Sequence, residues 1–432
     1  MDIREQYQDF DLNQEPFLRR AELDPDSFDW AYPEVDEMEL IDSQENTFHP
    51  EDHYPKPPEN LPENHPVVLA WKALLLAQEE MQAGVDIINT LNSEVHGKVE
   101  KVLKIPGSAP SKFLKKARVN HLQEKKDFLQ KALAYLHLYN ACPDTSKEPE
   151  DSELLHQVES NFIGHMVYLV VRSATHIFKP TRENGQMVMD HTYKTCVQVM
   201  NSHLARIKRT SSPAEKSALY ERMNKGMIVA LCHDYLEDFP EMTPQFLANK
   251  LTQHLTFDTI TEASIRRSGY HIPIDTNPFT RNEASIMRLL ATLTKPVKGS
   301  PNRKNYLHQR IIKENTLTED ERVVAMEVKC ADRLHNLNTL GAKPLAKRIN
   351  YLRETLQEIV CTTMDVLERS PEATQLRMNI TNLSMTVARL ALDLREQHFP
   401  EIQALGADTE ANLNITIEAA KVAFQEYYSA ED

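Results

Sequence analysis

The chain is poor in the residues and runs that make up sheets and membrane spans. Only ten glycines occur in 432 residues, and runs of Val, Ile or Thr are few. No segment reaches about 18 uninterrupted apolar residues, and the N-terminus lacks a basic stretch followed by an apolar one. These absences argue against a large sheet, a transmembrane helix and a classical secretion signal.

Cysteine and phosphate-loop motifs are also scarce. Neither GxGxxG, nor a Walker-type loop, nor an internal repeat occurs. The five cysteines are odd in number and far apart, so they indicate neither a disulfide framework nor a cysteine-type zinc site. We therefore expect a protein of the reducing cytoplasm, with export as an effector left as an alternative. The cysteines are Cys142, Cys196, Cys232, Cys330 and Cys361.

Basic residues are scarce in the first 65 residues of the chain. Residues 1–65 hold 19 acidic and 4 basic residues (4 − 19 = −15), so they account for the whole net charge of −15. This acidic, proline-rich extension is expected to be flexible or docked, and it is a candidate binding segment for a protein partner. The rest of the chain is neutral, which disfavours nucleic acid as a partner. Aromatic residues available for docking are Phe10, Phe17, Phe28, Trp30 and Tyr32.

From residue 66 onward, the sequence shows the apolar spacing of helices. Apolar residues recur every three to four positions in residues 67–88, 125–139, 323–340 and 349–367, which predicts an all-α fold. We divide this part into a helical N-terminal region, a central helical domain and C-terminal helices packed on that domain. The respective residues are 66–153, 154–365 and 366–432.

In the stretch "ALCHDYLEDFP", residues 230–240, an apolar run is followed by His233-Asp234 and then by a second acidic pair, Glu237-Asp238. In a helix, His233 lies one turn from Glu237, and Asp234 lies one turn from Asp238. Three carboxylates around one imidazole would repel and desolvate each other unless a cation held them. We therefore expect a metal ion here. The alternative is the polar end of an ordinary core helix, because a His-Asp pair is expected about once by chance.

Two neighbouring ligands supply only one edge of a coordination sphere, so further ligands are needed. Asp332 follows an apolar stretch in "VVAMEVKCADRLHNLNTL", and His191 opens an amphipathic segment in "NGQMVMDHTYKTCVQVM". Two alternatives remain open: His176 can replace His191 as a ligand, and Asp332 can instead form an ion pair with Lys329 or Arg333. His335 is interpreted as structural.

These motifs together resemble the RelA/SpoT-type alarmone hydrolases, a branch of the HD-domain metal phosphohydrolases. "CHDYLEDF" is similar to their HDxxED element, and "VKCADRLHNLNTL" to their KxADRLHNxxTL element. "FKPTRENGQMVMDHTYKTCVQVM" resembles the opening segment, "LLATLTKPVKGSPNRKNYLHQRI" the connecting segment and "KRINYLRETLQEIV" the closing helix. The resemblance covers roughly residues 160–365. No synthetase domain is recognisable.

The resemblance implies an HD-domain helical bundle that removes the 3'-pyrophosphate of ppGpp or pppGpp and leaves GDP or GTP. It implies that Glu237 and Asp238 orient and deprotonate the attacking water. It also implies a set of ligands to one Mn2+ ion: His191, His233, Asp234 and Asp332.

Substrate-binding residues follow from the same comparison. Arg182 lies at the family's basic turn, Asn336 and Thr339 match positions that line the nucleotide pocket, and Arg303 and Lys304 are suited to neutralise the pyrophosphate. The chain departs from the family at Glu183, Asp190, Thr192 and Phe239. These changes leave two alternatives: another nucleotide substrate such as NADPH, or a nucleotide-binding regulatory protein whose HD site is not catalytic. The oligomeric state is left open.

Overall fold

The computed structural model describes residues 50, 54–99, 109–142, 149–178, 188–238, 243–255, 278–296, 306–314 and 316–428. All of them belong to one structural unit, residues 46–432. Most of the predicted acidic extension, residues 1–49 and 51–53, lies outside this described part.

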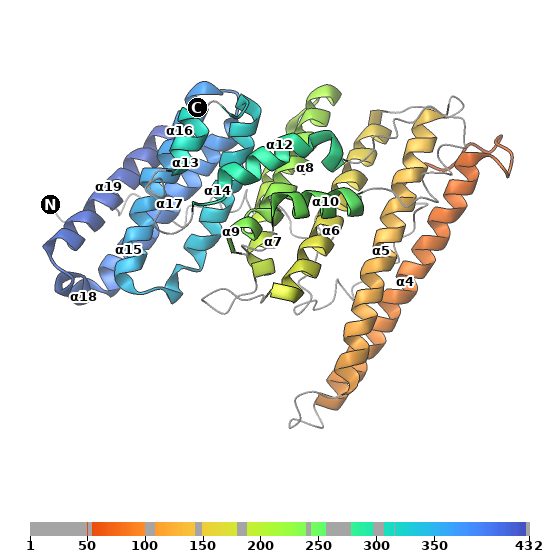
Figure 1. The fold of residues 1–432 in the computed structure, drawn as a ribbon, viewed down its shortest axis with the longest axis horizontal. Coiled ribbons are helices and arrows are strands. Elements are labelled where there is room, and N and C mark those ends of the chain that lie inside the picture. Colours follow the sequence, from red (N-terminus) through yellow and green to blue (C-terminus); the bar gives the residue numbers. More distant parts are fainter. Residues whose placement is uncertain are drawn as a thin grey trace. The chain divides into compact units, whose positions relative to one another are not determined.

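Every element assigned in the described part is helical (Figure 1), which confirms the all-α prediction. No described helix combines the length and apolar character that a membrane span requires. The helices are α4 (Pro66–Val99), α5 (Ala109–Ala141), α6 (Pro149–Phe178), α7 (Val188–Arg209), α8 (Pro213–Cys232), α9 (Tyr235–Asp238), α10 (Pro244–Leu255), α12 (Pro278–Leu293), α13 (Tyr306–His308), α14 (Glu319–Asn338), α15 (Leu345–Glu354), α16 (Cys361–Arg369), α17 (Thr374–Gln397), α18 (Phe399–Ala404) and α19 (Ala407–Tyr428). Shorter π or 3-10 turns are η3 (Gln309–Lys313), η4 (Leu340–Ala342) and η5 (Thr355–Val360).

The N-terminal helices α4 and α5 pack along each other, and α5 also packs on α6. The α4–α5 interface is aromatic, with the rings of Trp71 and Tyr135 centred 5.0 Å apart. Tyr135 is fully buried and its hydroxyl donates a hydrogen bond to the carbonyl of Pro55. This contact ties the segment before α4 to the helical pair. The expected boundary at residue 153 falls within α6, because that helix begins at Pro149.

Helices α7, α8 and α14 pack on one another. Gly226 of α8 permits the close approach of α7, because a Cβ atom at this position would lie 2.8 Å from Cγ1 of Val199. On α14, apolar residues such as Val324 and Val328 are fully buried. The apolar periodicity read from residues 323–340 therefore marks a central core helix.

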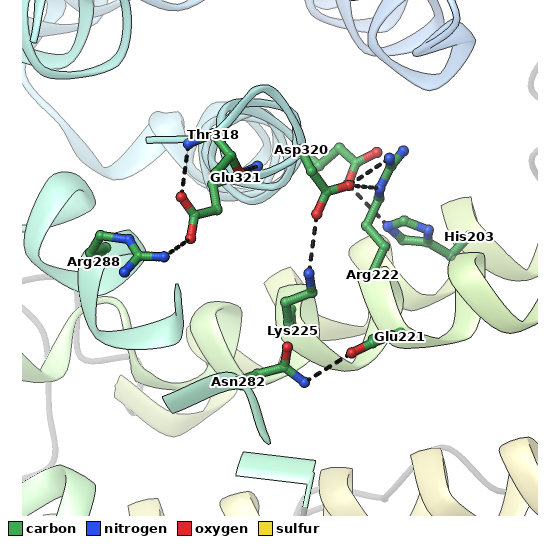
Figure 2. A network of polar contacts seen from close by, with 10 residues as sticks. His203, Glu221, Arg222, Lys225, Asn282, Arg288, Thr318, Asp320 and Glu321 are labelled. Atoms are coloured by element: carbon green, nitrogen blue, oxygen red, sulfur yellow. Dashed lines mark hydrogen bonds and ion pairs between the residues drawn. The ribbon is translucent and has the colours of Figure 1, made fainter. Parts of the chain in front are cut away.

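Helix α14 begins at a capping box. The Thr318 hydroxyl accepts a hydrogen bond from the Glu321 amide at 3.2 Å, and the Glu321 carboxylate accepts one from the Thr318 amide at 2.9 Å. Figure 2 shows how the first turn is also tied to its neighbours. Glu321 pairs with Arg288 of α12 at 2.5 Å. Asp320 pairs with Arg222 at 2.6 Å and with Lys225 at 3.1 Å, both on α8.

At the C-terminal end, α17 packs against both α14 and α19. The pattern in residues 349–367 predicts one helix, and the structure forms α15 and α16 with the π-helical turn η5 between them. Backbone helicity is thus continuous, but the turn is wider over Thr355–Val360. Helix α17 thus connects α19 to the central helix α14.

Candidate metal centre

The predicted ligands come from three separate parts of the chain. His191 lies in the first turn of α7, which begins at Val188. His233 and Asp234 form the turn between α8 and α9, because α8 ends at Cys232 and α9 begins at Tyr235. Asp332 lies on the buried helix α14. The packing of α7, α8 and α14 brings these four side chains together.

The four side chains form a compact set of nitrogen and oxygen atoms. Nε2 of His191 lies 3.0 Å from Oδ1 of Asp332 and 3.3 Å from Oδ2 of Asp234. Nε2 of His233 lies 3.0 Å from Oδ1 of Asp234 and 3.7 Å from Oδ1 of Asp332. All four residues are buried, and His191 is completely so. Each carboxylate therefore faces both imidazoles.

A buried group consisting of His191, His233 and Asp332 can hold a metal ion. One ligand atom from each of these residues lies within 4.8 Å of the others. Imidazole nitrogen and carboxylate oxygen together suit several divalent ions, so the donors do not identify the metal. Asp234 contacts both imidazoles and is placed to complete or support the set.

The two imidazoles differ in how they are held. Nδ1 of His233 lies 2.8 Å from the carbonyl oxygen of Ala230, which can only accept, so this nitrogen carries the proton and donates it. Nε2 of His233 is thereby directed at the carboxylates as the available ligand atom. Among the described residues, neither ring nitrogen of His191 makes a hydrogen bond of acceptable geometry. A buried imidazole without such a hydrogen bond is consistent with a metal ligand.

Asp332 has two polar neighbours on its own helix. Lys329 places its Nζ 2.9 Å from Oδ2, and Asn336 donates a hydrogen bond from Nδ2 to Oδ1 at 2.6 Å. The ion pair with Lys329, which the sequence offers as the alternative to metal binding, is thus present on the far oxygen. Oδ1 still faces the imidazoles. The two interpretations of Asp332 are compatible because the carboxylate has two oxygens.

The pKa values reflect a strong mutual attraction. Burial alone lowers the pKa of His233, but Asp234 and Asp332 outweigh it and raise that pKa to about 10. Burial raises the pKa of Asp332, yet the positive charge of Lys329 and contacts with the imidazoles hold it well below its ordinary value. The pKa of Asp234 is also lowered, because His233 offsets the cost of burial. The two carboxylates thus remain ionised and hold a proton on Nε2 of His233, which a metal ion bound there would displace.

The structure describes some of the predicted catalytic and substrate-binding residues and not others. Asn336 contacts a predicted ligand, and Thr339 lies at the end of α14 with its hydroxyl near the carbonyls of His335 and Asn336, at 3.4 and 3.3 Å. Glu237 and Asp238 belong to α9, but their side chains lie outside the described part. Arg182, Arg303 and Lys304 lie outside it entirely.

His335 is closer to the site than its sequence position indicates. Its ring is centred 4.9 Å from the ring of His191 and is buried. The helical spacing from Asp332 is the only sequence signal for this, and it does not show which neighbouring helix the ring meets. Arg333 points to another partner, because its guanidinium lies 4.2 Å from the ring centre of Tyr351 on α15.

No family model matches the chain, and neither a curated protein nor a solved structure is significantly similar to it. The resemblance to the alarmone hydrolases therefore depends on the motifs quoted above and on the geometry of the residues within them.

Proposed function

We propose that the chain is an HD-type, metal-dependent phosphohydrolase that removes the 3'-pyrophosphate from ppGpp and pppGpp. The observation that carries the proposal is the convergence of His191, His233 and Asp332, with Asp234, in one buried set. These are the residues that the motif resemblance assigns as ligands to Mn2+. Three chain segments far apart in sequence would have little reason to bring two imidazoles and two carboxylates together without a cation.

The protein groups have separate tasks in this proposal. His191 and His233 supply nitrogen ligands, and the hydrogen bond to Ala230 keeps the second ring in the required tautomer. Lys329 and Asn336 hold the carboxylate of Asp332 in its orientation. A divalent ion bound there would polarise a phosphoryl oxygen and make a nearby water more acidic.

Proton transfer is assigned to the helix that follows the first pair of ligands. Glu237 and Asp238 lie within a helical turn of Asp234, because α9 begins directly after it. We assign to them the orientation and deprotonation of the attacking water. Asn336 and Thr339 are assigned to the nucleotide, and Arg182, Arg303 and Lys304 to its phosphates.

Turnover of ppGpp by the purified protein tests the substrate. With Mn2+ present, we expect GDP and pyrophosphate in equal amounts, identified by anion-exchange chromatography. Orthophosphate release from another nucleotide such as NADPH, without cleavage of ppGpp, would instead support the alternative substrate. Glu183 in place of a second basic residue is the sequence feature that favours this alternative.

A paired set of variants separates the metal ligands from the groups that move protons. Glu237→Ala should retain bound metal and lose at least about a hundredfold in kcat, because a positioned general base contributes that much or more. Glu372→Ala replaces an exposed glutamate between α16 and α17 and serves as the matched control. Unchanged turnover in Glu237→Ala would contradict the role assigned to α9.

A non-catalytic regulatory protein is the rival of a different class. In that case the protein with Mn2+ would bind ppGpp tightly, as measured by isothermal titration calorimetry, and would release no product over long incubation. The additional helices α4, α5, α17 and α19 favour partners beyond a small substrate. This result would overturn the catalytic proposal and leave the metal centre intact.

A further inference from the structure

Helix α4 carries a stripe of exposed aliphatic side chains. Leu69, Leu76 and Ile87 are 52, 57 and 54% exposed, although large aliphatic residues are usually buried. In a helix with 3.6 residues per turn these three residues share one face, and the smaller Ala73 and Ala83 fall on the same stripe. The opposite face, with Trp71 and Leu74, is buried against α5. The helix therefore has a second apolar face that α5 does not cover.

The charges beside the stripe restrict what can cover it. The side chain of Lys72 is 56% exposed and forms an ion pair with the nearly fully exposed Glu63, 3.7 Å away. Glu79 and Glu80 lie on the other side of Leu76 and are exposed. The face thus carries one lysine, weakly paired with Glu63, on one side of Leu76 and two glutamates on the other. Apart from Glu63, the acidic extension is a poor match, because it would bring its excess of carboxylates against these glutamates.

We propose that this face of α4 joins two copies of the chain in an antiparallel helix pair centred on Leu76. In such a pair, positions equally far from Leu76 in opposite directions face each other across the two-fold axis. Leu76 meets Leu76 of the second copy, and Leu69 meets Ala83 of the second copy. Lys72 meets Glu80 of the second copy, with Glu79 beside it. A parallel pair is disfavoured because it sets these glutamates against their own equivalents.

The part of the surface between Leu69 and Ala83 is therefore self-complementary, as an isologous contact requires. Ile87 lies beyond the paired part, because its counterpart is residue 65, before α4 begins. The aliphatic residues supply the buried area, and the two symmetric sets of Lys72 with Glu79 and Glu80 set the direction and register of the pair. This inference does not depend on the metal centre, which lies on other helices.

Cysteine cross-linking tests the register. In full-length protein with the exposed Cys361 replaced by serine, Leu76→Cys should form a disulfide-linked dimer under mild oxidation. Leu69→Cys is the control, because its two equivalents would lie about 21 Å apart along the helix axis and cannot be bridged. Equal cross-linking of both variants, or none in either, would overturn the proposal.

Sedimentation velocity tests the same surface without cross-linking. The wild-type chain should be a dimer at micromolar concentrations, and Leu76→Glu should weaken the dimer at least about tenfold. Val422→Glu, at an equally exposed site on α19, should leave it unchanged. Lys72→Glu should also weaken the dimer, and adding Glu79→Lys and Glu80→Lys should restore it. A monomeric wild-type chain, or a dimer unaffected by Leu76→Glu, would contradict the inference.

Circular dichroism separates loss of association from loss of folding. Because Leu76 is exposed, Leu76→Glu should retain the helical signal and thermal transition of a monomer. If the variant instead loses helical signal, the side chain is required for folding and the interface assignment is wrong.

Discussion

At the residue scale, His233 uses its two ring nitrogens for different tasks. Nδ1 donates a hydrogen bond to the carbonyl of Ala230, and Nε2 faces Asp234 and Asp332. The fixed tautomer is a local consequence of the helix end, since the carbonyl belongs to the last turn of α8. This arrangement allows the same dipeptide, His233 and Asp234, to supply two different kinds of ligand atom. A His-Asp pair in a sequence does not by itself show which ring nitrogen of the histidine is free to bind a metal.

Lys329 offers a residue-scale prediction. It supplies a buried positive charge next to Asp332, so Lys329→Gln should destabilise the metal-free protein by about 3 kcal/mol or more. A bound divalent ion would supply much of the missing charge, so the increase in Tm on adding Mn2+ should be larger than in the wild type. Differential scanning calorimetry with and without Mn2+ measures both effects. Lys347→Gln, on the exposed side of α15, is the control. An equal Mn2+ response in Lys329→Gln and the wild type would contradict this account of the charge balance.

The residues of the candidate site could be predicted from the sequence, and their surroundings could not. The motifs around His233 and Asp332 contain enough information to select these residues from 17 histidines and many acidic groups. The contact from Asn336 to Asp332 and the proximity of His335 to His191 depend on side-chain orientation and helix packing. Spacing places Asn336 one helical turn after Asp332, but it does not fix the hydrogen bond or the neighbour of His335. The sequence therefore predicts Asn336 only as a residue of the nucleotide pocket.

At the element scale, the predicted helices reflect a strong apolar period. Residues 67–88, 125–139 and 323–340 lie almost entirely within α4, α5 and α14. The π-helical turn η5 was missed because a single widened turn hardly disturbs the apolar pattern of residues 349–367. The close contact at Gly226 was also missed, since a glycine within a helix does not show which neighbour approaches it.

Gly226→Ala tests the contact between α7 and α8. The added methyl group would meet Cγ1 of Val199 at 2.8 Å, and the resulting displacement should cost about 1–3 kcal/mol. The better helix propensity of alanine offsets part of this cost. Gly341→Ala is the matched control, because a Cβ atom there meets nothing within 4 Å. Thermal unfolding should show a lower Tm for Gly226→Ala only, and equal Tm values would show that α7 has room to move.

The packing of α5 on α6 predicts a dependence of stability on pH. Burial lowers the pKa of His121 to about 4 and that of His165 to about 3, with Lys125 adding to both shifts. His165 also lies 2.8 Å from the carbonyl of Leu122 through Nε2. In the unfolded chain both pKa values return to about 6.5, so below that pH the unfolded state takes up protons that the folded state excludes.

Stability should therefore fall as the pH is lowered from about 6.5 toward 4, by about 1.4 kcal/mol per pH unit for each histidine. Urea unfolding followed by circular dichroism at pH 8, 6.5 and 5 measures this loss. His165→Gln should show a smaller loss between pH 6.5 and 5 than the wild type, because one of the two titrating groups is gone. The same loss in both proteins would mean that His165 is not the group responsible.

At the scale of the whole molecule, the negative charge and the candidate site belong to different parts of the chain. Residues 1–65 carry the entire net charge of −15, and the candidate metal centre belongs to the helical part that follows in the sequence. Composition predicts this separation, because proline and acidic residues are concentrated at one end. Composition cannot predict that α14 meets α7 and α8, since that meeting depends on contacts with helices that lie far earlier in the chain.

Metal stoichiometry tests the central claim most directly. Chelator-treated full-length protein should bind one Mn2+ per chain in a calorimetric titration, and Asp332→Ala should abolish this binding, because it removes one of the two carboxylates that face both imidazoles. Asp365→Ala, which removes a more exposed carboxylate on α16, should bind as the wild type does. Absence of binding to the wild-type chain, or undiminished binding to Asp332→Ala, would contradict the assignment of a metal centre to this set.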